Sequence, residues 1–242
     1  MRRSPLAAVL ALAGLIFLPT PAAEAGALRV SPLNLDLSSQ RPAATLTLRN
    51  DDGSPVNVQV RVYRWAQRGA REVLTPTEDV AVSPPIASIE ARGERIIRVV
   101  GLAVQGPGER AYRVVVDELP PPPDAQGRQV RLLMRHSIPV FVTPAAATAA
   151  RLEQLQMSAR RGPGGLLLTA ENRGARRVRV ADLRVLDATG QVISERPGLL
   201  GYVLAGAQMG WELPAATDTG APFRLKAETD AGSLDITLSP RL

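Results

Sequence analysis

The chain of 242 residues holds few side chains that could carry out catalysis. His136 is the only histidine, and there is no cysteine. A serine–histidine–aspartate triad would have to use His136, and no G-x-S-x-G sequence accompanies it. One histidine cannot supply a paired-histidine metal site, and no Walker or G-x-G-x-x-G loop is present. We therefore expect no enzyme, no cofactor and no metal, and we expect His136 to be a strand residue with a local hydrogen-bond partner.

Two charged clusters have simple structural explanations. "NDD" at 50–52 contains oxygen ligands, but it lacks the ligand spacing of a calcium loop, so we expect an ordinary turn. "RRVRV" at 176–180 is the densest basic cluster, and its alternation predicts Arg177 and Arg179 on the solvated outer face of a strand. No aromatic residues are interleaved with these arginines, which argues against a nucleic-acid surface despite the formal charge of +6.

The first 25 residues have the pattern of a cleavable export signal. Arg2 and Arg3 precede an apolar stretch from Leu6 to Leu18, which is too short to span a bilayer comfortably, and "AEA" at 23–25 is a small-x-small cleavage site. We expect cleavage after Ala25. Because the chain has no cysteine, the exported protein must be stable by core burial alone.

The elements that must position any functional side chain are strands. Segments such as "ATLTLRN" and "VNVQVRVYRW" alternate apolar and polar residues and are separated by turns rich in Gly and Pro. About seven strands are expected between 28 and 143. A second series of short strands follows, in which "LTAENRGARRVRV" echoes "LTLRNDDGSPVNV". We predict an all-β protein of two immunoglobulin-like β-sandwich domains, 26–144 and 145–242, joined near 144–151.

The stretch "VRLLMRHSIPVFVTP" at 130–144 is a long alternating strand. One face carries seven of its residues, namely Val130, Leu132, Met134, His136, Ile138, Val140 and Val142, and Leu133 and Phe141 lie on the other. The segment before it, "ELPPPPDAQGRQ", is unsuited to packing in a core. Taken alone, the pattern favours an ordinary core strand, but it leaves open what the first half packs against.

Several motifs together resemble the periplasmic pilus chaperones of the chaperone–usher pathway. They are "NLDLSSQRPAATLTLRNDD", "VYRWAQ", "AVSPPIASIEARGERIIRV", "ERAYRVVVDELPP" and "IPVFVTP", in the order and spacing of that family. The resemblance covers essentially the whole exported chain. The "YRWAQ" and "IPVFV" segments look more like the branch that serves archaic or spore-coat-like pili.

The resemblance implies a function for the first half of the long strand. Family members lend this strand to pilus subunits that lack their last strand, a form of β-strand addition, and deliver them to an outer-membrane usher without nucleotide or metal. Matching "SIPVFVTP" to the family places the donor side chains at Val130, Leu132 and Met134. Ile138, Val140 and Val142 would then belong to the chain's own core. An unprotected apolar strand would also favour self-association of the free chain.

The resemblance departs from the family at the carboxylate anchor. The family holds the subunit's C-terminal carboxylate with an Arg and a Lys, and the matching positions here are Asn34 and Pro139. We expect another arginine to take this role, with Arg135 as first candidate because it could bind a carboxylate in bidentate fashion. Arg98 and Glu109 match a buried charge pair at the interdomain cleft of the family.

Two other functions stay open at this point. The chain could be an exported immunoglobulin-like structural or adhesin component of a surface assembly. It could also be an enzyme accessory or carbohydrate-binding module, but such modules usually display aromatic platforms, and only Trp65 and Trp211 are available here. Trp65 follows a Val-rich strand and is expected to pack in a core.

Overall fold

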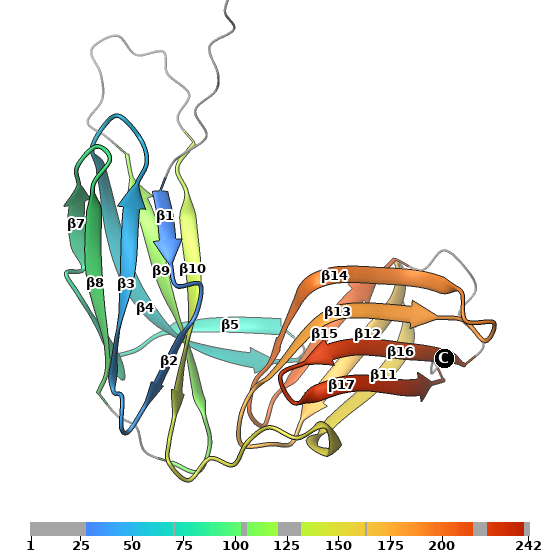
Figure 1. Ribbon diagram of the computed structural model, residues 1–242. Coiled ribbons are helices and arrows are strands. Elements are labelled where there is room, and N and C mark those ends of the chain that lie inside the picture. The colour runs from blue at the N-terminus through green and yellow to red at the C-terminus, as the bar shows by residue number, and fades with distance from the viewer. Residues whose placement is uncertain are drawn as a thin grey trace, which may run out of the picture.

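The computed structural model describes residues 28–69, 71–102, 106–120, 132–162, 164–214 and 222–239. The predicted signal peptide with its cleavage site, and Val130 of the predicted donor strand, lie outside these residues. Figure 1 shows two β-sandwiches arranged as the arms of an L, with the lower ends of β9 and β10 at the corner. The chain is all-β, as its alternating pattern predicts.

The first sandwich contains the strands that build the candidate site. Its strands are β1 (Leu28–Ser31), β2 (Leu35–Ser38), β3 (Ala43–Asn50), β4 (Val56–Arg68), β5 (Arg71–Pro76), β6 (Val80–Ser83), β7 (Ile86–Ile89), β8 (Glu94–Gly101), β9 (Arg110–Leu119) and β10 (Arg135–Thr143). One sheet has the order β1-β3-β8-β6, and the other has the order β2-β10-β9-β4-β5 with β7 also paired to β4.

The segment from Leu28 to Leu37 is not the single strand that its alternation suggests. β1 pairs with β3 in one sheet, whereas β2 pairs in parallel with β10 in the other. The switch falls at Pro32, which lacks the N–H that a continuous ladder would need. β1 is therefore an edge strand of one sheet and β2 an edge strand of the other, and β2 pairs with only part of β10.

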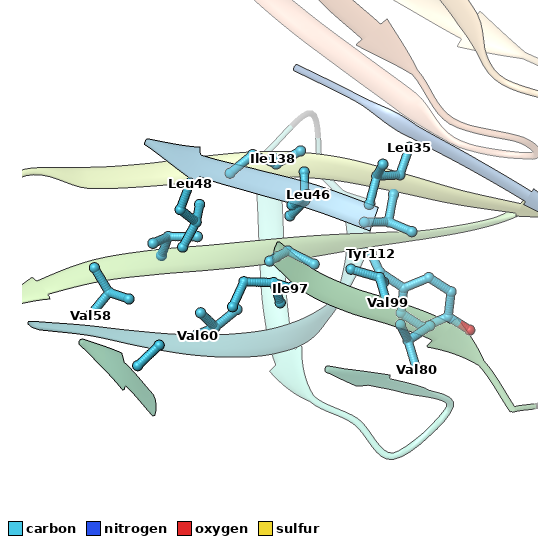
Figure 2. Close-up of a cluster of buried hydrophobic side chains, with 14 of the residues drawn as sticks. Leu35, Leu46, Leu48, Val58, Val60, Val80, Ile97, Val99, Tyr112 and Ile138 are labelled. Atoms are coloured by element: carbon cyan, nitrogen blue, oxygen red, sulfur yellow. The ribbon is translucent and has the colours of Figure 1, made fainter. Parts of the chain in front are cut away.

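The core of this domain follows from the period-two pattern. Inward residues of both sheets meet in one apolar cluster, part of which Figure 2 shows; it includes Leu46, Val58, Ile97, Tyr112 and Ile138. Each of these side chains is buried. Since adjacent strand residues point to opposite faces, the residues between them lie on the outer faces of the sandwich.

The second sandwich is smaller, and a single 3₁₀ turn, η1, leads into its first strand. Its elements are η1 (Leu152–Gln154), β11 (Leu155–Gly162), β12 (Gly165–Asn172), β13 (Val178–Leu186), β14 (Val192–Val203), β15 (Gln208–Leu213), β16 (Phe223–Thr229) and β17 (Gly232–Leu238). The sheets have the orders β11-β12-β15 and β14-β13-β16-β17. They enclose a separate apolar core around Leu168, Leu183 and Leu213.

The sequence echo between the two domains is also a structural one. Asn50 and Asn172 end equivalent strands and are both buried. Each Nδ2 donates to the carbonyl four residues on, Ser54 at 2.8 Å and Arg176 at 2.7 Å. Each Oδ1 accepts from the N–H two residues on, at 2.9 and 2.8 Å. The "NDD" cluster is therefore a turn, as predicted, in which Asn50 satisfies buried backbone groups.

Within the part of the chain that the structure describes, no helix is long and apolar enough to cross a membrane. No group of three or more His, Cys, Asp or Glu side chains among the same residues could hold a metal ion.

Candidate functional site

The N-terminal half of β10 has an open edge. Along one side, β10 pairs with β9 from Arg135 to Val142. Along the other side, β2 pairs only from Val140 to Thr143. No described strand therefore pairs with the second side of β10 from Arg135 to Pro139 (Figure 1). Such an edge carries backbone donors and acceptors that can bind another strand.

Apolar side chains lead into this open edge. Leu132 is 76% exposed, Leu133 47% and Met134 36%, although all three are apolar. Farther along the same strand, Ile138, Val140 and Val142 are buried in the core of the first domain. Leu132 and Met134 share the face of these core residues by alternation. The same face of this segment therefore carries buried core side chains from Ile138 onward and exposed apolar side chains at Leu132 and Met134.

Glu118 sets the point at which the ladder between β9 and β10 ends. Its N–H donates to the Met134 carbonyl at 3.0 Å. In a regular antiparallel pair the Met134 N–H would donate to the Glu118 carbonyl, but here it donates to Glu118 Oε2 at 3.2 Å. The carboxylate replaces the next ladder bond, and β10 accordingly begins at Arg135.

Arg135, the predicted carboxylate anchor, lies on the outer face and is engaged within the chain. Its Nε donates to Asp117 Oδ1, and Arg61 Nη2 donates to the other oxygen of Asp117 at 2.6 Å. Burial acts to raise the pKa of Asp117, but the hydrogen bonds from Arg61 and Arg135 together hold that pKa below its ordinary value. The Arg135 side chain is 67% exposed, so solvent competes for it.

A second arginine, Arg113, lies opposite Pro139, the position that matches the family's lysine anchor. Pro139 on β10 is directly opposite Arg113 on β9, which is directly opposite Tyr63 on β4. The Arg113 guanidinium carbon is 3.8 Å from the centroid of the Trp65 ring, and Nη2 is 3.2 Å from Glu72 Oε1. Asn34 donates to Asp36 at 3.1 Å and presents no charge. Arg113 is therefore the cation nearest in register to Pro139 on this face.

The expected pairing of Arg98 with Glu109 is wrong. Arg98 is an exposed outer residue of β8, opposite Thr45 and Ser83, in the sheet that does not contain Glu109. Glu109 instead accepts from Arg177 of the second domain, from Nη1 at 2.7 Å and from the backbone N–H at 3.0 Å.

Arg177 is consequently not the solvated residue that its alternating sequence predicts. Its side chain is only 11% exposed, and Nη2 lies 2.6 Å from Asp36 Oδ1. The guanidinium carbon is 3.7 Å from the centroid of the Phe141 ring. Thr143 Oγ1 donates to Glu109 at 2.8 Å and completes this cluster. Arg177 therefore joins β2, β10 and the residue just before β9 of the first domain to the second.

An aromatic cluster fixes the same boundary. Trp65 and Phe141 of the first domain pack with Leu204 and Tyr202 of the second. The ring centroids of Phe141 and Tyr202 are 5.2 Å apart. Beside them, Gln67 Nε2 donates to the Tyr202 carbonyl at 2.7 Å, and Gln67 Oε1 accepts from the Leu204 N–H at 2.9 Å. Trp65 thus packs in a core, as predicted, and is not an exposed platform.

His136 is a strand residue of β10, as expected. Its Nε2 is buried and has no hydrogen-bond partner among the described residues. The side chain lies on the same face as Met134 and Ile138, between the exposed and buried parts of the strand.

The comparison with protein families matches the domain that carries the open edge. Residues 27–148 match the family model for "Pili and flagellar-assembly chaperone, PapD N-terminal domain". The chain belongs to this chaperone family. The matched range contains β1 to β10, so the family assignment includes the open edge of β10. No curated protein sequence matches this family member.

Solved structures of chaperones share its fold over nearly the whole chain. The chaperone–tip adhesion subunit complex CsuC–CsuE, from archaic Csu pili of Acinetobacter baumannii, has a TM-score of 0.66 at 22% identity, covering 89% of this chain and 99% of that one. The Salmonella enterica SafA pilin–SafB chaperone complex has a TM-score of 0.61 at 18% identity, covering 89% and 97%. The Pseudomonas aeruginosa CupB2 chaperone has a TM-score of 0.56 at 18% identity, covering 88% and 100%. The TM-scores and coverages show that these structures share the two-domain fold of this chain.

Sequence reasoning missed several residues of this site. Gln67 lies near the end of β4 and carries no local signal of a partner in the second domain. The sequence predicts Glu118 only as the end of a strand, and its role in ending the ladder between β9 and β10 is seen from its contact with Met134. Arg113 could have been found from the strand alternation, because "YRVVVDEL" places it on the outer face.

Proposed function

We propose that this protein is a periplasmic chaperone that captures pilus subunits by lending them the segment before β10. The observation that carries the proposal is the exposure of Leu132 and Met134 on the face that continues the buried core side of β10. Val130 is included on its alternation alone. A subunit that lacks one strand would cover these side chains and pair with the open edge.

The energetics suit a reversible but firm capture. Burying one side chain of this size stabilises by roughly 1.5–3 kcal/mol, so Leu132 and Met134 together give about 3–6 kcal/mol before ordering costs. Strand addition contributes backbone hydrogen bonds, each with a net value of about 0.5–1.5 kcal/mol. When free, the same apolar groups favour association of two copies, which subunit binding would suppress.

The C-terminal carboxylate of the subunit requires a cation on the outer face of β10, the face that carries Arg135 and Pro139. Arg135 is one candidate, but Asp117 already accepts from it. Arg113 is the stronger candidate, since it lies opposite Pro139 and its partner Glu72 is exposed enough to be displaced. Its guanidinium, held over Trp65, is oriented before a carboxylate arrives.

The cellular setting follows from the family. The similar structures include chaperones in complex with a tip adhesion subunit and with a pilin, which supports exported pilus subunits as partners of this protein. The predicted signal peptide and family membership support a periplasmic location and delivery to an outer-membrane usher. The mechanism uses strand exchange and requires no nucleotide, metal or catalytic residue. Similarity to the Csu chaperone supports the archaic branch.

The proposal is tested by purification of the C-terminally tagged protein from the periplasm of its native host, with mass spectrometry of bound proteins. Wild type is compared with Leu132→Asp and with Leu199→Asp, a matched control at a leucine of β14 that is 55% exposed. We expect small exported β-rich subunits with wild type and Leu199→Asp and their loss with Leu132→Asp, with all three proteins folded by circular dichroism.

Two outcomes would overturn the proposal. If Leu132→Asp unfolds, Leu132 belongs to the core and the donor register is wrong. If no subunit is bound by folded wild type, the chain is better explained as an immunoglobulin-like structural or adhesin component.

A further inference from the structure

A buried carboxylate lies on the core face of β9, opposite the residue that precedes β10. Glu118 is 9% exposed and follows Val116 on the face that builds the apolar core of the first domain. Acidic side chains are rarely buried unless they have a partner. Arg61 and Arg135 do not supply one, because both lie on the outer face of the sheet and pair with Asp117.

The only side-chain hydrogen bond of Glu118 among the described residues is to the backbone of Met134. Glu118 Oε2 accepts from the Met134 N–H at 3.2 Å, and the Glu118 N–H donates to the Met134 carbonyl at 3.0 Å. Both backbone groups of Met134 are thus held by one residue of β9. Because side chains stand roughly perpendicular to a sheet, a bond to the carboxylate turns the Met134 N–H toward the core face. The peptide group between Leu133 and Met134 therefore has a defined orientation.

We propose that Glu118 is a positioning residue for subunit capture, because its carboxylate fixes the direction in which the chain approaches β10. This inference rests on the proposed function. The peptide group that Glu118 holds adjoins the exposed residues Leu132 and Leu133, which are 76% and 47% exposed. A segment held in this way presents Leu132 and Met134 before a subunit arrives, so less ordering is needed on binding.

Loss of the carboxylate should affect capture more than folding. Met134 is 36% exposed, so water can bind its N–H when Glu118 is replaced, and the chain should fold. The backbone before β10 then loses its defined orientation and must be ordered when a subunit binds. Ordering the backbone of one residue changes an equilibrium constant about tenfold. We therefore expect capture to fall by about this factor.

Three substitutions at Glu118 separate the hydrogen bond from the charge. Glu118→Gln keeps an acceptor oxygen at the same reach but removes the charge. Glu118→Asp keeps the charge on a side chain one methylene shorter, and Glu118→Ala removes both. The tagged variants, wild type and the exposed control Glu94→Ala are purified from the periplasm of the native host, and captured subunit is measured per tagged chain by mass spectrometry. Hydrogen–deuterium exchange of the Met134 amide is followed by NMR in each free protein, after circular dichroism has shown that it is folded.

Capture should follow the protection of the Met134 amide. In Glu118→Ala and Glu118→Asp this amide should exchange at least about tenfold faster than in wild type, and captured subunit should fall about tenfold. Glu118→Gln and Glu94→Ala should stay within about twofold of wild type in both measurements. If Glu118→Ala does not fold, Glu118→Asp takes its place in each comparison.

The outcomes separate this inference from the proposed function. If the Met134 amide of Glu118→Ala exchanges as slowly as in wild type, the carboxylate does not hold the segment and the inference is refuted. It is also refuted if this amide exchanges faster without loss of capture. Loss of capture in Glu118→Gln while its Met134 amide stays slow refutes it as well, because the charge itself then contacts the subunit. Strand capture by wild type stands in all three cases. If folded wild type binds no subunit, the proposed function and this inference both fail.

Discussion

Replacing Glu109 by alanine should destabilise the protein far more than replacing an exposed carboxylate of the same domain. The Glu109 side chain is 2% exposed and accepts from Arg177 Nη1, from the Arg177 N–H and from Thr143 Oγ1. Its removal leaves the Arg177 guanidinium, which is 11% exposed, with only Asp36 at 2.6 Å as a close carboxylate among the described residues.

The magnitude follows from the burial of both partners. Breaking a buried ion pair by removing one partner costs about 3–5 kcal/mol, because the other charge stays buried. Asp36, whose side chain is 48% exposed, compensates Arg177 only in part. A whole domain is stable by only about 5–15 kcal/mol, so this loss should separate the unfolding of the two domains. An exposed pair is worth about 0–1 kcal/mol. Glu94, which is 3.5 Å from Arg49 with both side chains 56% exposed, therefore provides the matched control.

Urea denaturation followed by tryptophan fluorescence measures this effect in each domain. Trp65 reports on the domain boundary and Trp211 on the second domain, and the chain has no other tryptophan. We expect Glu109→Ala to lower the midpoint strongly and to divide the transition, with Glu94→Ala within about 0.5 kcal/mol of wild type. If both variants unfold alike, Glu109 does not stabilise the boundary between the two domains.

Three further predictions concern two residues of β9 and one of the second domain. Asp117 has a lowered pKa, so its contribution to stability is complete above the ordinary value of 3.8 and is lost as the pH falls through the lower folded-state value. Urea midpoints taken from about pH 5 to about pH 3 should fall more for wild type than for Asp117→Asn, and parallel curves would contradict the contacts with Arg61 and Arg135. Arg113→Gln should reduce captured subunit about tenfold in the periplasmic purification, since a hydrogen bond to a charged group is worth about 1.5–3 kcal/mol; undiminished capture would exclude Arg113 as the anchor. Asn172→Ala leaves a buried N–H and two carbonyls unpaired and should cost about 2–3 kcal/mol in thermal unfolding, whereas a loss under about 0.5 kcal/mol would show that water replaces the amide.

Properties that depend on neighbouring residues could be predicted from the amino-acid sequence. Period-two alternation is local, so it identified the strands, the all-β class and the core face of Ile138, Val140 and Val142. The turn at Asn50 and its echo at Asn172 were also visible, because turn chemistry depends on a few adjacent residues. The ordered motifs gave the chaperone family, which the match to residues 27–148 confirms.

Which strands and charges meet could not be predicted in this way, because the contacts join distant parts of the chain. Arg177 contacts Glu109, which is 68 positions away along the chain, and Asp36, which is 141 positions away. Gln67 contacts Tyr202, which is 135 positions away. No local pattern specifies such distances. An alternating arginine therefore looks solvated although it is buried at the domain boundary.

The open edge of β10 was undecided for the same physical reason. Alternation places Leu132 and Met134 on the core face, but whether that face is covered depends on how far β2 runs beside β10. The switch at Pro32 and the capture of the Met134 N–H by Glu118 set the two ends of this edge. Sheet order and register are properties of several distant segments at once, and they determine whether an apolar strand residue belongs to a core or stays available to a partner.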